Sequence, residues 1–183
     1  MCKFKSGLIM KDRVFIPDYD SHRDMLNELK IADTRANAER LFVRAELYPK
    51  DGDVFSDIDT WTFNVDQDIR PEWFVEEDDK ARMITAVKEW AKTHIYIGVD
   101  GLKIESGAGY YIKDCKDVEI VNATVNEVYG NATVNEGKGY AVIIGSPYGW
   151  KNDSNLVLSE NATFKDCQAK IIYQSGGWEL RSV

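Results

Sequence analysis

The chain has 183 residues, of which 44% are hydrophobic and 30% are charged. This composition suits one domain or two small ones with a hydrophobic core, and it excludes a disordered chain. No apolar run approaches the roughly 20 residues that span a bilayer, so we expect no membrane partner. The net charge of −8 differs from the basic footprint of nucleic-acid-binding proteins, so we expect no direct contact with nucleic acid.

The first hundred residues alternate strand-like and helix-like patterns, which predicts a mixed domain over residues 1–100. Its clearest element is a helix in which Met83, Val87 and Trp90 recur at helical spacing. The predicted elements in chain order are strands at Lys3–Met10 and Arg13–Ile16, helices at Ser21–Lys30 and Asp33–Arg40, strands at Leu41–Leu47 and Thr60–Val65, a helix at Glu76–Lys92 and a strand at Ile95–Val99. The expected fold class is α+β, with two to three helices on an antiparallel sheet.

Residues 101–183 form a second region, rich in glycine, that predicts short β-strands followed by an irregular tail. Residues 122–130 and 131–139 are two copies of a nine-residue repeat that begins Asn-Ala-Thr-Val-Asn-Glu. The Ala and Val of each copy lie two positions apart, so they share one face of a strand. This pattern predicts a short solenoid or a stacked meander, in which one copy packs on the next and the asparagines form a ladder.

The segments Cys2–Gly7, Lys11–His22, Asp53–Trp61 and Tyr111–Cys115 resemble uncharacterised phage and prophage proteins of gut Firmicutes. Those proteins carry short Asn-Ala-Thr-Val repeats after a shared N-terminal domain. The resemblance implies an accessory protein of a phage, and it supplies no catalytic residues.

The cysteines and the N-terminus predict a cytoplasmic protein, in the host cell if a phage encodes it. Cys2, Cys115 and Cys167 are widely spaced and form no CxxC pair, as in proteins with reduced thiols and without a zinc site. The N-terminal residues lack the apolar segment of a secretory signal. No phosphate-binding loop, GxSxG or HExxH motif occurs, so we expect no cofactor and no catalytic residue.

Residues 51–79 contain eleven acids and a single base, Arg70. Asp57 and Asp59 belong to one of three Asp-x-Asp pairs, and carboxylate oxygens of this kind suit Ca²⁺ or Mg²⁺. The pair is therefore a candidate metal site. Two alternatives stay open, namely a solvated loop that leads into a helix N-terminus and an acidic face that docks a basic partner protein.

A second candidate site is a Gly/Pro/Ser-rich loop that carries Tyr148, Trp150 and Lys151. Its aromatic rings could stack on a flat ligand while the lysine contacts a phosphate. Trp178, after two glycines, is a weaker instance of the same pattern. An ordinary ordered turn is the alternative interpretation of this loop.

Four other residues are interpreted as structural. Trp61 and Trp90 lie on strand and helix patterns and are expected in the core. His22 and His94 have no Ser or Cys partner at a recognisable spacing, which predicts surface or core positions.

We therefore expect a non-enzymatic binding protein, a phage counter-defence protein that sequesters a nucleotide-like signal of host immunity. Two alternatives are an acidic blocker of a host defence protein, as in anti-CRISPR proteins, and an enzyme with paired carboxylates and a divalent metal. A short strand stack ends in unpaired edges, so a homo-oligomer is also expected.

Overall fold

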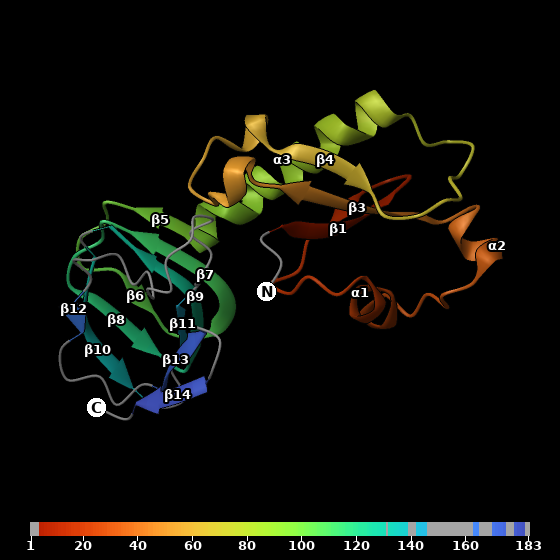
Figure 1. Cartoon of the computed structure of the whole chain (residues 1–183). Coiled ribbons are helices and arrows are strands. Elements are labelled where there is room, and N and C mark those ends of the chain that lie inside the picture. The colour runs from red at the N-terminus through yellow and green to blue at the C-terminus, as the bar shows by residue number, and fades with distance from the viewer. Residues whose placement is uncertain are drawn as a thin grey trace. The chain divides into compact units, whose positions relative to one another are not determined.

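The computed structural model describes residues 4–130, 132–138, 142–145, 163–164, 170–174 and 178–181. The chain divides into two compact units between Lys92 and Thr93, whereas the sequence analysis placed the division after residue 100. The difference arises because Ile95–Ile97, predicted as the last strand of the first domain, pairs with a strand of the second unit. The fold class is α+β, as predicted, and the described residues include three α-helices and one antiparallel sheet (Figure 1).

The first unit contains a four-stranded antiparallel sheet in the order β2-β1-β3-β4. Its strands are β1 (Lys5–Met10), β2 (Val14–Phe15), β3 (Phe42–Tyr48) and β4 (Thr62–Val65). Its helices are α1 (His22–Glu28), α2 (Arg35–Ala38) and α3 (Glu76–His94), with short 3-10 turns η1 (Lys50–Gly52) and η2 (Ile58–Thr60). The predicted hairpin, the two short helices and the long helix are confirmed, with shorter bounds for all but the last.

Local capping explains where the short helices begin. Ser21 precedes α1 in extended conformation, and its side chain accepts a hydrogen bond from the Asp24 N–H. Thr34 caps α2 in the same way through the Asn37 N–H. Each cap satisfies one of the donors that the first helical turn leaves unpaired.

Helices cover both faces of the sheet, which is why β1 is buried at every position. Gly7 lies against Met83 of α3, where an added Cβ would come within 3.0 Å of the Met83 side chain. Leu8, which points to the opposite face, packs with Met25 and Phe42 in the cluster formed with α1. The sheet therefore separates an α3 face from an α1 face.

In the second unit the chain passes alternately between two mainly parallel sheets. One sheet has the order β14-β13-β11-β9-β7-β5 and the other β12-β10-β8-β6. The strands are β5 (Ile95–Ile97), β6 (Lys103–Ile104), β7 (Gly107–Lys113), β8 (Val118–Val121), β9 (Ala123–Tyr129), β10 (Thr133–Lys138), β11 (Val142–Gly145), β12 (Thr163–Phe164), β13 (Lys170–Gln174) and β14 (Trp178–Arg181). Only the pair β13–β14 is antiparallel in these two sheets.

The strands stack with a spacing of 16 to 18 residues, which is not the nine-residue period of the sequence. Ile95 pairs with Tyr111 and Tyr111 with Glu127, 16 positions apart in each case, and Thr124 pairs with Val142, 18 positions apart. The two nine-residue copies contain β9 and β10, which lie in different sheets. The predicted stacking of one copy directly on the next, with an asparagine ladder between them, is therefore wrong for this pair.

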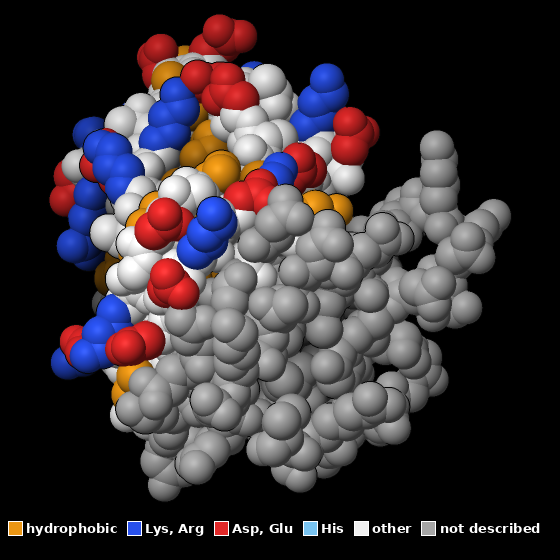
Figure 2. Space-filling model, turned by 90° about the vertical axis from the view of Figure 1, so that its left-hand side faces the viewer, with side chains coloured by type: hydrophobic (Ala, Val, Ile, Leu, Met, Phe, Trp, Pro, Cys, Tyr) orange, Lys and Arg blue, Asp and Glu red, His pale blue; other side chains and the backbone are white. Residues whose placement is uncertain are grey.

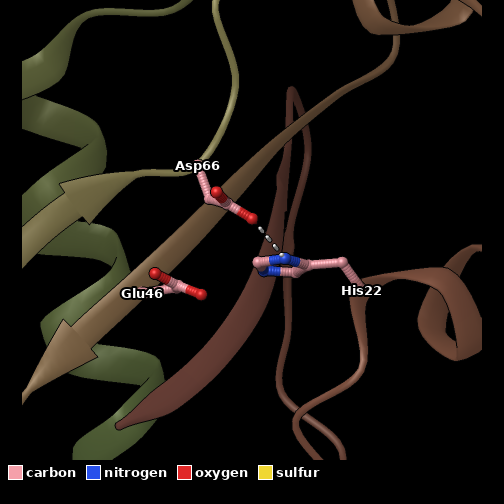
Figure 3. Close-up of side chains that lie close together, drawn as sticks. All are labelled: His22, Glu46 and Asp66. Carbon is pink, nitrogen blue, oxygen red and sulfur yellow. Dashed lines mark ion pairs between the residues drawn. The ribbon is translucent and has the colours of Figure 1, made fainter. Parts of the chain in front are cut away.

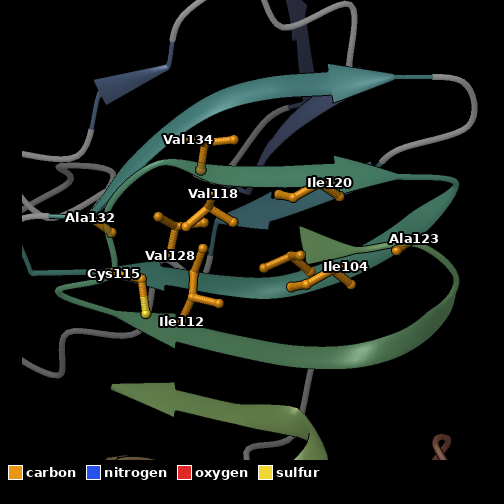
Figure 4. Packing of buried hydrophobic residues seen from close by; sticks show 10 residues of the cluster. Ile104, Ile112, Cys115, Val118, Ile120, Ala123, Val128, Ala132 and Val134 are labelled. Atoms are coloured by element: carbon orange, nitrogen blue, oxygen red, sulfur yellow. The ribbon is translucent and has the colours of Figure 1, made fainter. Parts of the chain in front are cut away.

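The space between the two sheets is filled by apolar side chains (Figure 4). Ala123 and Val125 from the first copy and Ala132 and Val134 from the second all belong to this core, so the prediction that each Ala-Val pair faces inward is confirmed. Cys115 is also buried here, and its thiol hydrogen donates to backbone carbonyls at 3.4 and 3.5 Å.

Within the described part of the chain, no helix combines the length and the apolar character that crossing a membrane requires.

Candidate metal site

One imidazole nitrogen and two carboxylate oxygens converge on the α1 face of the first unit. His22, Glu46 and Asp66 each place one such atom within 4.8 Å of the other two (Figure 3). We call these three residues the ligand cluster. It is the group of three or more His, Cys, Asp or Glu side chains with this geometry among the described residues.

Three separate elements bring the cluster together. His22 is the first residue of α1, whose start is fixed by the Ser21 cap. Glu46 lies on the central strand β3. Asp66 directly follows β4, and its N–H donates to the Arg44 carbonyl, 2.9 Å away, which extends the β3–β4 pairing by one residue. The cluster thus depends on the sheet register and on the position of α1 together.

The His22 ring is oriented by a backbone carbonyl. Its Nε2 lies 3.3 Å from the Ala45 oxygen, and a carbonyl oxygen can only accept, so Nε2 carries the proton of that hydrogen bond. The other ring nitrogen, Nδ1, lies 3.3 Å from Asp66 Oδ2. Two lone pairs facing each other at this distance repel, so a cation between them, a second ring proton or a metal ion, is what makes the arrangement favourable. Metal-binding histidines commonly donate their other N–H to a backbone carbonyl in this manner.

Glu46 is the buried member of the cluster, with 8% of its surface exposed. Its Oε2 accepts hydrogen bonds from the Tyr48 hydroxyl and, at 3.4 Å, from Asn64 Nδ2. Among the described residues no donor contacts Oε1. One oxygen of the carboxylate is therefore held in place while the other is available to a cation.

These distances suit a small divalent ion. Zn²⁺ binds nitrogen and oxygen ligands at about 2.0–2.2 Å, so two of its tetrahedral ligands lie about 3.4 Å apart. The His22–Asp66 distance already has this value, and Glu46 needs only a small side-chain rotation to reach it. The Asp66 side chain is 56% exposed, which leaves the ion a route from solvent.

The comparisons with known proteins give no further guide to this site. No family model, no curated protein and no solved structure matches the chain. The argument for the site therefore rests on its own geometry.

The carboxylates predicted as a metal site have other contacts. Asp57 caps η2 by accepting from the Asp59 N–H at 3.1 Å, and Asp59 pairs with Lys88 of α3 at 2.6 Å. Neither belongs to a group of three potential ligands in the described residues. Their role as metal ligands stays a prediction.

Further acids of the segment 51–79 are also paired with bases, which reduces its excess negative charge. Glu76 contacts Arg70 at 2.7 Å and Asp79 contacts Arg82 at 2.6 Å. On the face drawn in Figure 2, basic and acidic side chains are likewise intermixed over the described part. We find no broad field of one sign on that part of the surface.

The predicted ligand-binding loop cannot be placed. Tyr148, Trp150 and Lys151 lie outside the described residues, and only the backbone of Trp178 is described, as the first residue of β14. The ligand contacts predicted for these four side chains therefore stay predictions. The core positions predicted for Trp61 and Trp90 are confirmed, with 4% and 9% of their surfaces exposed.

Sequence reasoning missed the ligand cluster. His22 was interpreted as a surface or core residue, and Glu46 as one of the alternating residues of a strand. A polar residue on the central strand of a sheet covered on both faces is the signal that could have identified Glu46, because a buried carboxylate needs partners. No spacing along the chain connects residues 22, 46 and 66.

Proposed function

We propose that the protein binds a divalent transition-metal ion through His22, Glu46 and Asp66, with Zn²⁺ the best fit. The observation that carries this proposal is the convergence of the three ligand atoms, with the His22 ring oriented by the Ala45 carbonyl. An imidazole ligand favours Zn²⁺ over Ca²⁺ and Mg²⁺, which prefer sites made of oxygen alone. Two carboxylates complete a ligand set that Zn²⁺ accepts.

The test is a titration of metal-free protein with Zn²⁺, Mg²⁺ and Ca²⁺, followed by calorimetry and thermal melting. Zn²⁺ at a hundred times its dissociation constant stabilises the protein by about 2.7 kcal/mol. Asp66→Asn removes one ligand at an exposed position and should abolish most of this stabilisation. Metal analysis of the loaded protein should give one ion per chain.

The matched control is the double variant Asp57→Asn, Asp59→Asn in the same unit. It removes the alternative carboxylates and an exposed ion pair, which contributes at most about 1 kcal/mol. Zn²⁺ binding that survives in Asp66→Asn but disappears in the double variant would contradict the proposed site. The same titration therefore decides between the two candidate metal sites.

An enzyme is the second candidate function, because three protein ligands leave a position for a reacting water on a tetrahedral ion. A metal-bound water is a nucleophile near neutral pH. Hydrolysis of a chromogenic ester by the Zn²⁺-loaded protein, lost in Asp66→Asn, would support this candidate. Binding of Zn²⁺ without turnover would support a binding protein.

The sequestration of a nucleotide-like host signal remains a separate proposal, as does the blocking of a host defence protein. Both are supported by the resemblance to phage proteins, and the first also by the composition of the loop at Tyr148–Lys151. A panel of nucleotides in calorimetry tests the first, since heat without turnover is the expected result. Homo-oligomer formation stays a prediction as well, and light scattering measures it directly.

For the second unit we propose a β-solenoid with two strands in each coil. The regular pairing of strands 16 to 18 residues apart supports this architecture, as does the continuous apolar core between the two sheets. The left-handed backbone at Gly98, Asp114 and Gly130, also 16 residues apart, supports a corner that recurs in each coil.

A further inference from the structure

Ser6 has a buried hydroxyl whose hydrogen-bonding capacity is unused in the described part of the chain. The residue is 0% exposed, and its Oγ makes no hydrogen bond with any described group. Burying a hydroxyl without a partner costs free energy, and folded proteins keep few such groups. A ligand that reaches Ser6 Oγ would remove this cost.

The sheet register places Ser6 beside the ligand cluster. Ser6 on β1 lies directly opposite Glu46 on β3. The Ser6 N–H points away from β3, because it donates to Asp20 Oδ1 at 3.2 Å. The two residues therefore form the close type of antiparallel pair, with Cα atoms about 4.5 Å apart and side chains on the same face.

Both neighbouring groups have unused capacity on this face. Glu46 Oε2 already accepts from Tyr48 and Asn64, while Oε1 has no described donor. A tetrahedral ion held by His22, Glu46 and Asp66 has one further position. An atom bound there lies on the α1 face of the sheet, the face that also carries the Ser6 side chain.

The charge of the site determines which ligand fits this position. Two carboxylates and a neutral imidazole balance the two positive charges of Zn²⁺. A phosphate would add negative charge beside a buried carboxylate, whereas a neutral oxygen donor would add none. Water has the further advantage that it can both donate to and accept from a serine hydroxyl.

We infer that the fourth position of the metal site takes a neutral oxygen donor, water in the resting protein, and that Ser6 Oγ hydrogen-bonds to it. Ser6 is then a positioning residue, which acts on the metal through the oxygen ligand. This inference rests on the proposed metal-binding function. It assigns a role to a hydroxyl that the fold itself does not use.

The test compares Ser6→Ala with the wild-type full chain, first without metal and then with Zn²⁺. Loss of a hydrogen-bonding group next to a metal site commonly weakens affinity 10- to 100-fold, so the Zn²⁺ dissociation constant should rise by about that factor. The melting temperature of the metal-free variant should stay unchanged or rise, because a buried hydroxyl without a partner is removed. Opposite changes in the two measurements distinguish a role at the metal from a structural role.

Ser56→Ala is the matched control, since the Ser56 hydroxyl is used by the fold. It donates to the Asp53 carbonyl at 2.6 Å and accepts from Trp61 Nε1 at 3.0 Å. This variant should lower the melting temperature and leave the Zn²⁺ dissociation constant unchanged. Inorganic phosphate added to the loaded wild type should produce no binding heat.

Three results would overturn the inference. They are an unchanged Zn²⁺ dissociation constant in Ser6→Ala, a weaker affinity that comes with a lower metal-free melting temperature, and phosphate binding that depends on the loaded metal. Wild-type protein that binds Zn²⁺ through Asp66 while Ser6→Ala binds it equally well would remove only this inference. Wild-type protein that binds no Zn²⁺ would remove the proposed function as well.

Discussion

The two units of this protein are stabilised in different ways. In the first unit, polar groups are buried beside the apolar core, among them Lys5, Ser6, Glu46 and Asp79. In the second unit, the cluster between the two sheets is made of apolar residues and one cysteine. Buried polar groups cost free energy unless they have partners, so a fold keeps them at specific places. This difference assigns chemistry to the first unit and a structural role to the interior of the second.

The largest expected effect comes from the core of the second unit. Ile120 is 0% exposed, and Ile120→Ala should lower the free energy of unfolding by about 2–5 kcal/mol because it leaves a cavity. Zn²⁺ affinity should not change, since the ligand cluster belongs to the other unit. Urea denaturation monitored by circular dichroism measures the first quantity and calorimetry the second.

Val121→Ala on the same strand is the control, because Val121 is only half-buried. Its effect on unfolding should be clearly smaller. A similar loss in both variants would mean that the interior of the second unit is not tightly packed, and the contrast between the units would fail.

A smaller effect is expected where the first unit buries a charge. Lys5 pairs with Asp20 at 2.9 Å, and its Nζ lies 4.7 Å from the centre of the Trp90 ring. Burial lowers the pKa of Lys5, although Asp20 acts in the opposite direction. Asp20→Asn leaves the buried charge unpaired and should destabilise the protein by about 2 kcal/mol at pH 7, less than for a fully buried pair because Asp20 is partly exposed.

The pH dependence of this variant provides its check. A lysine whose folded pKa lies below its unfolded value contributes stability above the unfolded pKa, and this contribution is lost as the pH falls through the folded pKa. The penalty of Asp20→Asn should therefore be largest at neutral pH and decrease in alkaline solution, where Lys5 is neutral. Urea denaturation at several pH values measures it, and a penalty independent of pH would show that Lys5 is not buried as a charge.

The smallest effect is expected at the corners of the second unit, where two glycines form a matched pair. Gly98 and Gly130 have φ values of +64° and +66°, a conformation that costs an alanine about 1–2 kcal/mol. An added Cβ meets nothing within 4 Å at Gly98, whereas at Gly130 it would lie 2.1 Å from Asp114 Oδ1. Gly130→Ala should therefore be less stable than Gly98→Ala in thermal melting, and equal losses would argue against the stacked corner.

Local features of this fold could be predicted from the sequence, whereas long-range ones could not. The hairpin at β1–β2 and the start of α1 at Ser21 depend on residues that are close in the chain, so turn and capping preferences were sufficient. The ligand cluster depends on the register of β3 with β4 and on where α1 lies over the sheet. The coil was mispredicted because the repeat has a period of nine residues, while the pairing of strands follows every 16 to 18.

The relation between these two periods limits how the repeat region can change in length during evolution. Thr124 and Val142 are paired 18 positions apart, which is the length of two nine-residue copies. Duplication of a single copy would transfer every later strand to the opposite sheet and exchange its neighbours. Duplication of two copies would add one full turn and leave the later pairings intact, so viable length variants should differ by an even number of copies.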